Sequence, residues 1–370
     1  MIIGVLKEQK EFENRVAATP ETVKKFIGLN HEVHVEKNAG DESFISDDDF
    51  IKSGAKIVSR KEVLKADLII QVQAMNLQDI SDLKNTQFIV GLLEPFNKKL
   101  NQTIIDNKLN AFALESLPRN SRAQSMDVLS SQANIAGYKA VMLAADTYRK
   151  FMPMLMTAAG TVKAAKVMIL GAGVAGLQAI ATAKRLGAIV EASDVRPAVK
   201  EQIESLGAKF IDVPLETDEE REAAEGHGGY AKPMPSSWLE RQNKLVEEKA
   251  TTADIIITSA LIPGKEPPVL ISENTVNKMK QGSVILDMAS GMAKDGSGNC
   301  PLTKPNEIIE INHITIIGKT NLPSLVSADA SSLYARNIFE FVKLLINEKN
   351  ELYINHEDEL VEGCLIKGDK

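Results

Sequence analysis

Three glycines in the middle of the chain stand at a spacing suited to holding phosphate. Gly171, Gly173 and Gly176 form the pattern G-x-G-x-x-G, directly after an apolar run over residues 167–170 that predicts a buried strand. In such a unit the first glycine allows a tight turn, the second lets a pyrophosphate approach the backbone, and the third lets helix pack on strand. The following helix directs its first amide groups at the phosphates. The pattern therefore predicts a Rossmann-type nucleotide-binding unit.

A carboxylate follows at the position where such a unit reads a ribose. Asp194 lies 18 residues after Gly176, at the end of a second predicted strand, and can bind the adenosine ribose hydroxyls. A 2′-phosphate would meet like charge there, so we expect NAD(H) rather than NADP(H). Arg196 is close, and we interpret it as the partner of a surface acid. A glycine turn in another kind of α/β domain would explain the glycines but not Asp194.

A second polar cluster precedes this unit. Arg119, Gln124, Asp127 and Ser130 offer donors and acceptors suited to a carboxamide. The alternative is structural: Ser125 or Asp127 could cap a helix. Composition does not decide between these two interpretations.

Bulk properties exclude several classes of protein. The 370 residues, 44% hydrophobic and 25% charged, describe a globular chain long enough for two domains. A net charge of −7 without a basic stripe argues against nucleic acid as a partner. Neither the two cysteines nor the five histidines have metal-ligand or catalytic spacing, so we expect no metal site and a reducing cytoplasm. The longest uncharged stretch, residues 167–183, is short for a membrane span.

Alternating strand and helix patterns predict an α/β fold of two doubly wound parallel sheets, with a nucleotide cleft between two Rossmann-like domains. We expect an N-terminal domain over residues 1–128, completed by a helix and tail within 325–370, and a nucleotide-binding domain over 129–324. The Met-rich segment 151–156 is expected to fill a core. Residues 216–237 predict a long loop, with a solvated acidic half and Tyr230 on a mobile lid.

Several motifs together resemble one family. They are the glycine-rich segment 171–187, the run SRAQSMD at 121–127, GGYAK at 228–232 and ALIPGK at 260–265. These are similar to the NAD(H)-binding component of proton-translocating nicotinamide nucleotide transhydrogenase, and the resemblance runs from Lys7 to about Cys364. It implies a Si-specific/Re-specific NAD(P)+ transhydrogenase, active only with partner subunits. Hydride would pass between NAD(H) and NADP on a beta subunit, and membrane-spanning subunits would move the proton. The family also suggests a homodimer, held at the inner membrane by its partners.

The same resemblance implies roles for named residues. Four would lie along the nicotinamide and its ribose: Arg119, Gln124, Asp127 and Ser130. The others would bind or cover the cofactor: Gly171, Gly173, Val174, Ala175, Gly176, Asp194, Val195, Arg196, Tyr230, Leu261, Pro263 and Gly264. The turn at 287–300 departs from the family pattern by being a few residues longer, so no contact is assigned to it.

Alanine dehydrogenase, which shares this fold, is the main alternative. Arg15 could hold a substrate carboxylate, but Gln73 stands where those enzymes carry a lysine, and residues 90–95 contain no histidine. Oxidative deamination needs a proton acceptor and a polarising group. Transfer of hydride between two nicotinamides needs only two rings held face to face. A non-catalytic NAD-sensing module is a further alternative, and hydride transfer to an added partner distinguishes it.

Overall fold

The computed structural model describes residues 1–225, 234–262 and 264–367. Contacts divide the chain into two units, residues 1–132 with 323–370, and residues 133–322. The chain passes from the first unit to the second within helix α6, Val128–Thr147. Across the described ranges, no helix is both long and apolar enough to cross a membrane.

The first unit is built on a parallel sheet with strand order β3-β2-β1-β4-β5-β6. The strands are β1 Ile2–Val5, β2 Glu32–Glu36, β3 Lys56–Val58, β4 Leu68–Gln73, β5 Phe88–Leu92 and β6 Asn110–Ala113. The helices are α1 Pro20–Gly28, α2 Asp47–Lys52, α3 Arg60–Val63, α4 Leu77–Ser81, α5 Lys98–Asp106, α12 Ser327–Val342 and α13 Glu359–Cys364. This is the doubly wound order, so the predicted fold class is confirmed for this unit.

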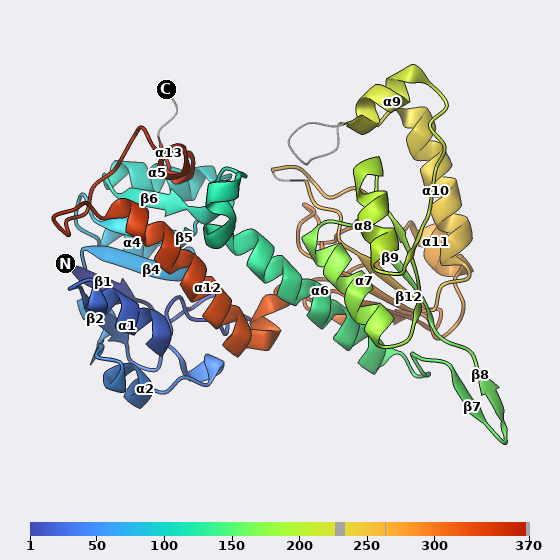
Figure 1. The fold of residues 1–370 in the computed structure, drawn as a ribbon, viewed down its shortest axis with the longest axis horizontal. Coiled ribbons are helices and arrows are strands. Elements are labelled where there is room, and N and C mark those ends of the chain that lie inside the picture. Colours follow the sequence, from blue (N-terminus) through green and yellow to red (C-terminus); the bar gives the residue numbers. More distant parts are fainter. Residues whose placement is uncertain (226–233, 263, 368–370) are drawn as a thin grey trace. The chain divides into compact units, whose positions relative to one another are not determined.

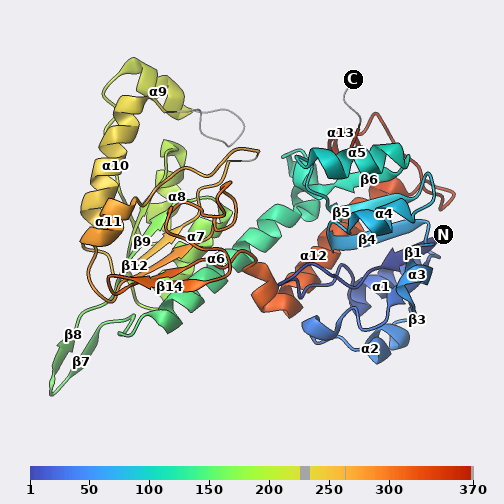
Figure 2. The same ribbon diagram turned by 180° about the vertical axis from the view of Figure 1, so that it is seen from behind.

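Helices cover both faces of this sheet, which is why its strands read as apolar runs. One face packs against α1, α2 and α12, with the Phe26 and Phe339 rings 5.0 Å apart, edge to face (Figure 1). The opposite face packs against α3, α4 and α5 (Figure 2). The Tyr334 hydroxyl of α12 donates to the carbonyls of Gln71 and Val72, and so holds the end of β4.

The C-terminal tail is not the small hairpin that its sequence predicts. Helix α13 forms, and Leu365 then pairs antiparallel with Phe112 of β6. The tail therefore completes the edge of the first sheet.

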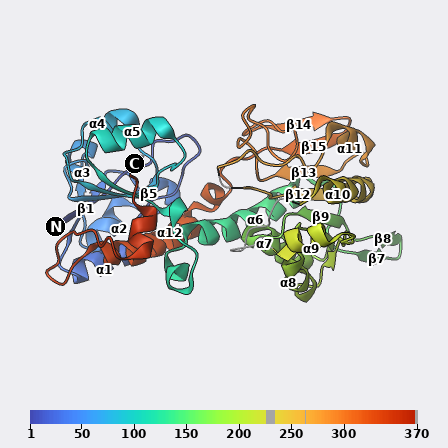
Figure 3. The same ribbon diagram turned by 90° about the horizontal axis from the view of Figure 1, so that it is seen from above.

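The second unit repeats the topology with an added edge strand, in the order β11-β10-β9-β12-β13-β15-β14. The strands are β9 Lys166–Leu170, β10 Ile189–Ser193, β11 Lys209–Phe210, β12 Ile255–Thr258, β13 Val284–Asp287, β14 Ile308–Ile311 and β15 Ile314–Ile317. The helices are α7 Val174–Arg185, α8 Lys200–Ser205, α9 Asp218–Glu225, α10 Ser236–Ala250 and α11 Glu273–Lys278. Helices α7 and α8 cover one face and α10 and α11 the other (Figure 3). Only β14 runs antiparallel to its neighbour within this sheet as described.

The acidic segment expected to be a solvated loop is partly wrong. It contains α9, and the Glu220 side chain is fully buried. Glu220 accepts hydrogen bonds from the backbone of Glu216 and from the hydroxyl of Ser237, and its carboxylate lies 2.8 Å from Arg241. This long-range ion pair supplies the anchor that the local sequence does not reveal.

The Met-rich segment does not fill a core either. Strands β7, Leu155–Thr157, and β8, Gly160–Val162, form a hairpin that projects from the second unit (Figure 1). Met154 and Met156 are 59% and 70% exposed, whereas Met152 is buried. The hairpin is therefore an exposed apolar surface.

The glycine turn gives a stability prediction. A Cβ at Gly176 would stand 1.9 Å from the carbonyl oxygen of Gly171, whereas one at Gly173 would meet no described atom within 4 Å. We expect Gly176→Ala to lower the free energy of unfolding by about 3 kcal/mol or more, because backbone cannot yield as a side chain does. Gly173→Ala should change it by less than about 1 kcal/mol. Urea denaturation of both variants measures this, and equal midpoints would refute the packing argument.

Candidate functional site

The three glycines of the turn after β9 have different surroundings. Gly171 adopts φ +97°, a conformation that side chains disfavour, and its amide donates to the Ser193 carbonyl over 2.9 Å. Gly176 lies against the Gly171 carbonyl, so α7 packs on the end of the strand. Gly173 alone among the three faces open space with respect to the described atoms. The turn therefore leaves room at the glycine where a pyrophosphate would approach.

Helix α7 begins directly after Gly173, with Val174 and Ala175 in its first turn. The amide groups of a first turn have no carbonyl partner inside the helix, and they carry the positive end of its dipole. The Ser259 hydroxyl donates to the Gly171 carbonyl over 3.0 Å and ties the end of β12 to this turn. The backbone thus presents donors suited to phosphate oxygens.

Asp194 follows β10 and is bonded on both oxygens. Its Oδ2 accepts from the Ala172 amide over 2.7 Å, and Oδ1 accepts from the Arg196 amide over 2.9 Å. The Arg196 guanidinium also forms a bidentate ion pair with it, with both contacts 2.9 Å long. The expected surface partner for Arg196 is therefore wrong, because this cation pairs with Asp194 itself.

A third strand end adds a loop that sequence reasoning left unassigned. Asn299 accepts from the Ala260 amide and donates to the carbonyls of Ala260 and Pro268, so it holds the segment before Leu261. Leu261 is exposed. Gly264 has φ +70°, and predicted residues Tyr230 and Pro263 lie outside the described residues.

The anchor of the 287–300 turn is Asp287, at the end of β13. Its fully buried carboxylate accepts from the hydroxyls of Thr258 and Thr303 and from the amides of Ala289 and Cys300. The apolar strand pattern gives no signal for this role. An acid at the end of a buried strand, followed by a long polar turn, is the available clue.

The predicted nicotinamide residues lie in the first unit. Arg119 and Gln124 are exposed, on the segment that includes the short helix η3, Ser121–Met126. Asp127 accepts from the amide and the hydroxyl of Ser130, over 2.9 and 2.5 Å, at the start of α6. The capping alternative is thus shown for Asp127 but not for Ser125. Capping does not exclude a binding role for the segment.

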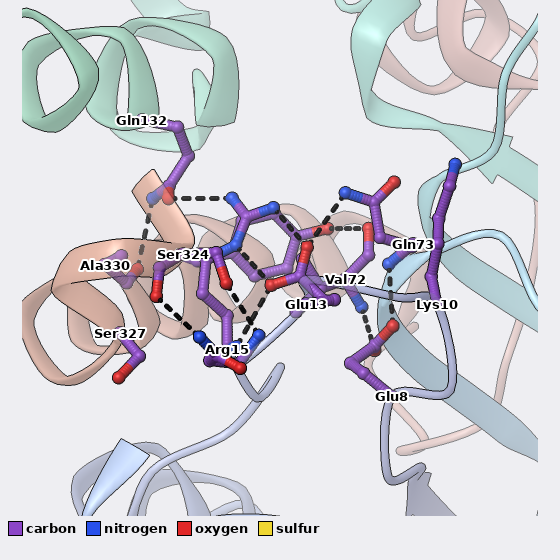
Figure 4. A network of polar contacts seen from close by, with 12 residues as sticks. Glu8, Lys10, Glu13, Arg15, Val72, Gln73, Gln132, Ser324, Ser327 and Ala330 are labelled. Carbon is purple, nitrogen blue, oxygen red and sulfur yellow. Dashed lines mark hydrogen bonds and ion pairs between the residues drawn. The ribbon is translucent and has the colours of Figure 1, made fainter. Parts of the chain in front are cut away.

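A buried network surrounds the residues at issue for alanine dehydrogenase chemistry (Figure 4). Arg15 is 3% exposed and makes a bidentate pair with Glu13, with contacts of 2.7 and 2.6 Å. Its Nη1 donates to Gln132 over 2.9 Å. The Gln73 amide donates to the same Glu13 over 2.9 Å. Internal partners therefore occupy the guanidinium that could hold a substrate carboxylate.

The neighbouring strand end offers a poor proton acceptor. Glu94 lies where the alternative function would need a histidine, and hydrogen bonds from Lys10 and Asn97 lower the pKa of its carboxyl. A base whose pKa lies below that of an ordinary carboxyl accepts protons weakly at neutral pH. The geometry does not favour oxidative deamination.

Comparison with known proteins agrees with this site. Residues 4–136 match the family model "Alanine dehydrogenase/PNT, N-terminal domain", and residues 140–369 match "Alanine dehydrogenase/PNT, C-terminal domain". Together the two models cover nearly the whole chain.

The relatives are more specific. The chain is 46% identical to the first of the separate alpha-subunit chains of the NAD(P) transhydrogenase of Rhodospirillum rubrum, over 100% of this chain and 97% of that protein. A crystal structure of transhydrogenase from Sinorhizobium meliloti matches with a TM-score of 0.81 and 41% identity, over 93% of each chain. Alanine dehydrogenase 1 of Staphylococcus aureus is 27% identical, over 99% of this chain and 93% of that one. The chain therefore belongs to the alanine dehydrogenase/PNT family and, within it, to the NAD(P) transhydrogenase alpha subunits.

Proposed function

We propose that the chain binds NADH at the glycine turn of its second unit and passes a hydride to NADP held by a partner subunit. The observation that carries the proposal is the open space at Gly173, directly before the first turn of α7. Asp194, bonded to the neighbouring Ala172 amide, adds the acid that reads a ribose. Membership of the transhydrogenase alpha subunits supports the same assignment.

Bound NADH supplies the hydride, so the protein needs no acid or base of its own for the transfer. Its task is positioning. In the proposal, Gly173 and the first amides of α7 hold the pyrophosphate, and Asp194 accepts hydrogen bonds from the adenosine ribose. The remaining binding residues are Gly171, Val174, Ala175, Gly176, Val195, Arg196, Tyr230, Leu261, Pro263 and Gly264. Arg119, Gln124, Asp127 and Ser130 orient the nicotinamide and its ribose.

The proposed partners are an NADP(H)-binding beta subunit and membrane-spanning subunits that couple the transfer to proton movement. The chain would act only with them, on the cytoplasmic side of the inner membrane. We also propose a homodimer. The exposed apolar side chains of the β7–β8 hairpin, including Leu155, Met156 and Val162, are a surface that a second copy could cover.

Gly173→Ala separates binding from folding. The added methyl group meets no described atom, and φ −73° suits alanine, but the methyl would stand where a pyrophosphate approaches. We expect NADH affinity, measured by calorimetry, to fall about tenfold or more, which corresponds to about 1.4 kcal/mol. Gly28→Ala is the matched control, because a Cβ there also meets nothing within 4 Å. Equal NADH affinity in Gly173→Ala and the unaltered chain would contradict the proposed pyrophosphate site.

Asp194 and Arg196 together should set the choice between NADH and NADPH. In Asp194→Asn the loss of a charge-assisted bond should weaken NADH binding by about 1–3 kcal/mol. The same change releases Arg196, whose guanidinium can then pair with a 2′-phosphate, so NADPH binding should improve. Arg196→Ala is the control: it keeps the carboxylate and should still reject NADPH. Equal or tighter binding of NADPH by the unaltered chain would overturn this assignment.

Gln124→Ala tests the nicotinamide segment without disturbing a cap. Gln124 is exposed, so its loss should not destabilise the first unit. We expect hydride transfer in the reconstituted complex to slow by about tenfold, with NADH affinity nearly unchanged, since the interaction matters in the transition state. Gln281→Ala, also exposed, is the control. A normal transfer rate in Gln124→Ala would leave the segment with its structural role only.

A further inference from the structure

The first unit holds a polar pocket that the proposed function does not use. Its volume is about 500 Å³, and its lining includes Leu6, Glu8, Gln71 and Met75. It lies at the carboxyl ends of β1 and β4, the neighbours at which the order 3-2-1-4-5-6 reverses. Open α/β sheets bind ligands at this point. The volume suits a small molecule.

The segment that follows β1 excludes a dinucleotide. In the second unit the equivalent turn carries three glycines, whereas residues 6–10 read Leu-Lys-Glu-Gln-Lys. Without glycine the backbone cannot cradle a pyrophosphate as Gly173 can. Side chains must therefore make the recognition.

Gln71 supplies a buried donor that the described residues leave unused. Its side chain is 2% exposed and lines the pocket, and its Nε2 has no hydrogen-bond partner among the described residues. It lies against β5, where a Cβ at Gly91 would stand 2.9 Å from its Cγ. The β4–β5 register shifts between Ile70 and Gln73, so the ladder is irregular at this residue. A buried amide without a partner is costly, which makes a ligand oxygen a favourable occupant.

Glu8 supplies a second group beside it. Its two oxygens accept from the amides of Val72 and Gln73, over 2.7 and 3.1 Å (Figure 4). Burial raises the pKa of this carboxyl to about 8. At neutral pH it therefore holds a proton and can donate a hydrogen bond.

The charges of the lining favour an anion. Arg60 is paired with Glu36 and Asp79, and Lys10 is paired with Glu94. Two further lining ammonium groups, on Lys7 and Lys99, form no ion pair with any described acid. A ligand that carries negative charge would meet two uncompensated cations at the rim and two donors inside.

We propose that this pocket binds a small carboxylate, whose oxygens accept hydrogen bonds from the Gln71 amide and the Glu8 carboxyl and whose charge Lys7 and Lys99 balance. Arg15 is not part of the lining, so the site does not depend on the guanidinium that Glu13 occupies. The proposal is also independent of hydride transfer.

The test is titration of the full chain with succinate, without any nucleotide, followed by calorimetry and saturation-transfer NMR. Succinamide, which is neutral, is the ligand control. We expect saturable succinate binding at millimolar concentration and none of succinamide. Gln71→Met and Lys99→Ala should each weaken succinate binding about tenfold, as loss of a charge-assisted bond does. Lys98→Ala, an exposed neighbour outside the lining, should leave it unchanged.

A stability readout excludes a merely structural effect. Gln71→Met removes a buried donor without a partner, so its urea midpoint should equal or exceed that of the unaltered chain. If that variant does not fold, Lys99→Ala, on the surface, still decides the matter. The proposal fails if succinate does not bind saturably, if succinamide binds equally well, or if Lys99→Ala and Lys98→Ala bind alike.

Discussion

The contact between Gly176 and the carbonyl of Gly171 is the constraint on which the nucleotide turn depends. It brings α7 against the end of β9 more closely than any other residue type allows. That approach places the first turn of the helix at the carboxyl edge of the sheet and leaves Gly173 facing open space. The Ser259 hydroxyl and the Asp194 carboxylate then bind this same turn from the two strands that flank β9. Phosphate recognition in the proposal is thus a consequence of backbone packing.

The two units share a strand order but differ in chemistry at the same topological position. In the second unit the turn after the first strand is glycine-rich and its donors are backbone amides. In the first unit that turn carries lysine, glutamate and glutamine side chains instead. Nearby, Glu13 and Gln132 satisfy Arg15 internally. A chain that transfers hydride between nicotinamides has no need of that arginine for a substrate, and its burial in a saturated network agrees with such a function.

Local patterns predicted much of this structure because local physics determines it. The apolar runs, the glycine spacing and the acid after β10 each depend on residues close in sequence, and β2 forms at Glu32–Glu36 as expected. Long-range partners explain the failures. Glu220 is buried only because Arg241 meets it, and the Met-rich hairpin is exposed although its composition suggests a core. Asn299 and Asp287 were missed because their partners come from other strands. The Asp194–Arg196 pair could have been foreseen, since only two residues separate them.

The most direct measurement uses one preparation of the chain in two assays. In the first, the chain is added to membranes that carry the partner subunits, with NADH and an NADP analogue. In the second, it is incubated alone with NAD and L-alanine. The account predicts NADH-dependent reduction of the analogue in the first assay and no turnover above background in the second. Robust oxidation of alanine by the chain alone, or no reduction of the analogue in the presence of the membranes, would contradict it.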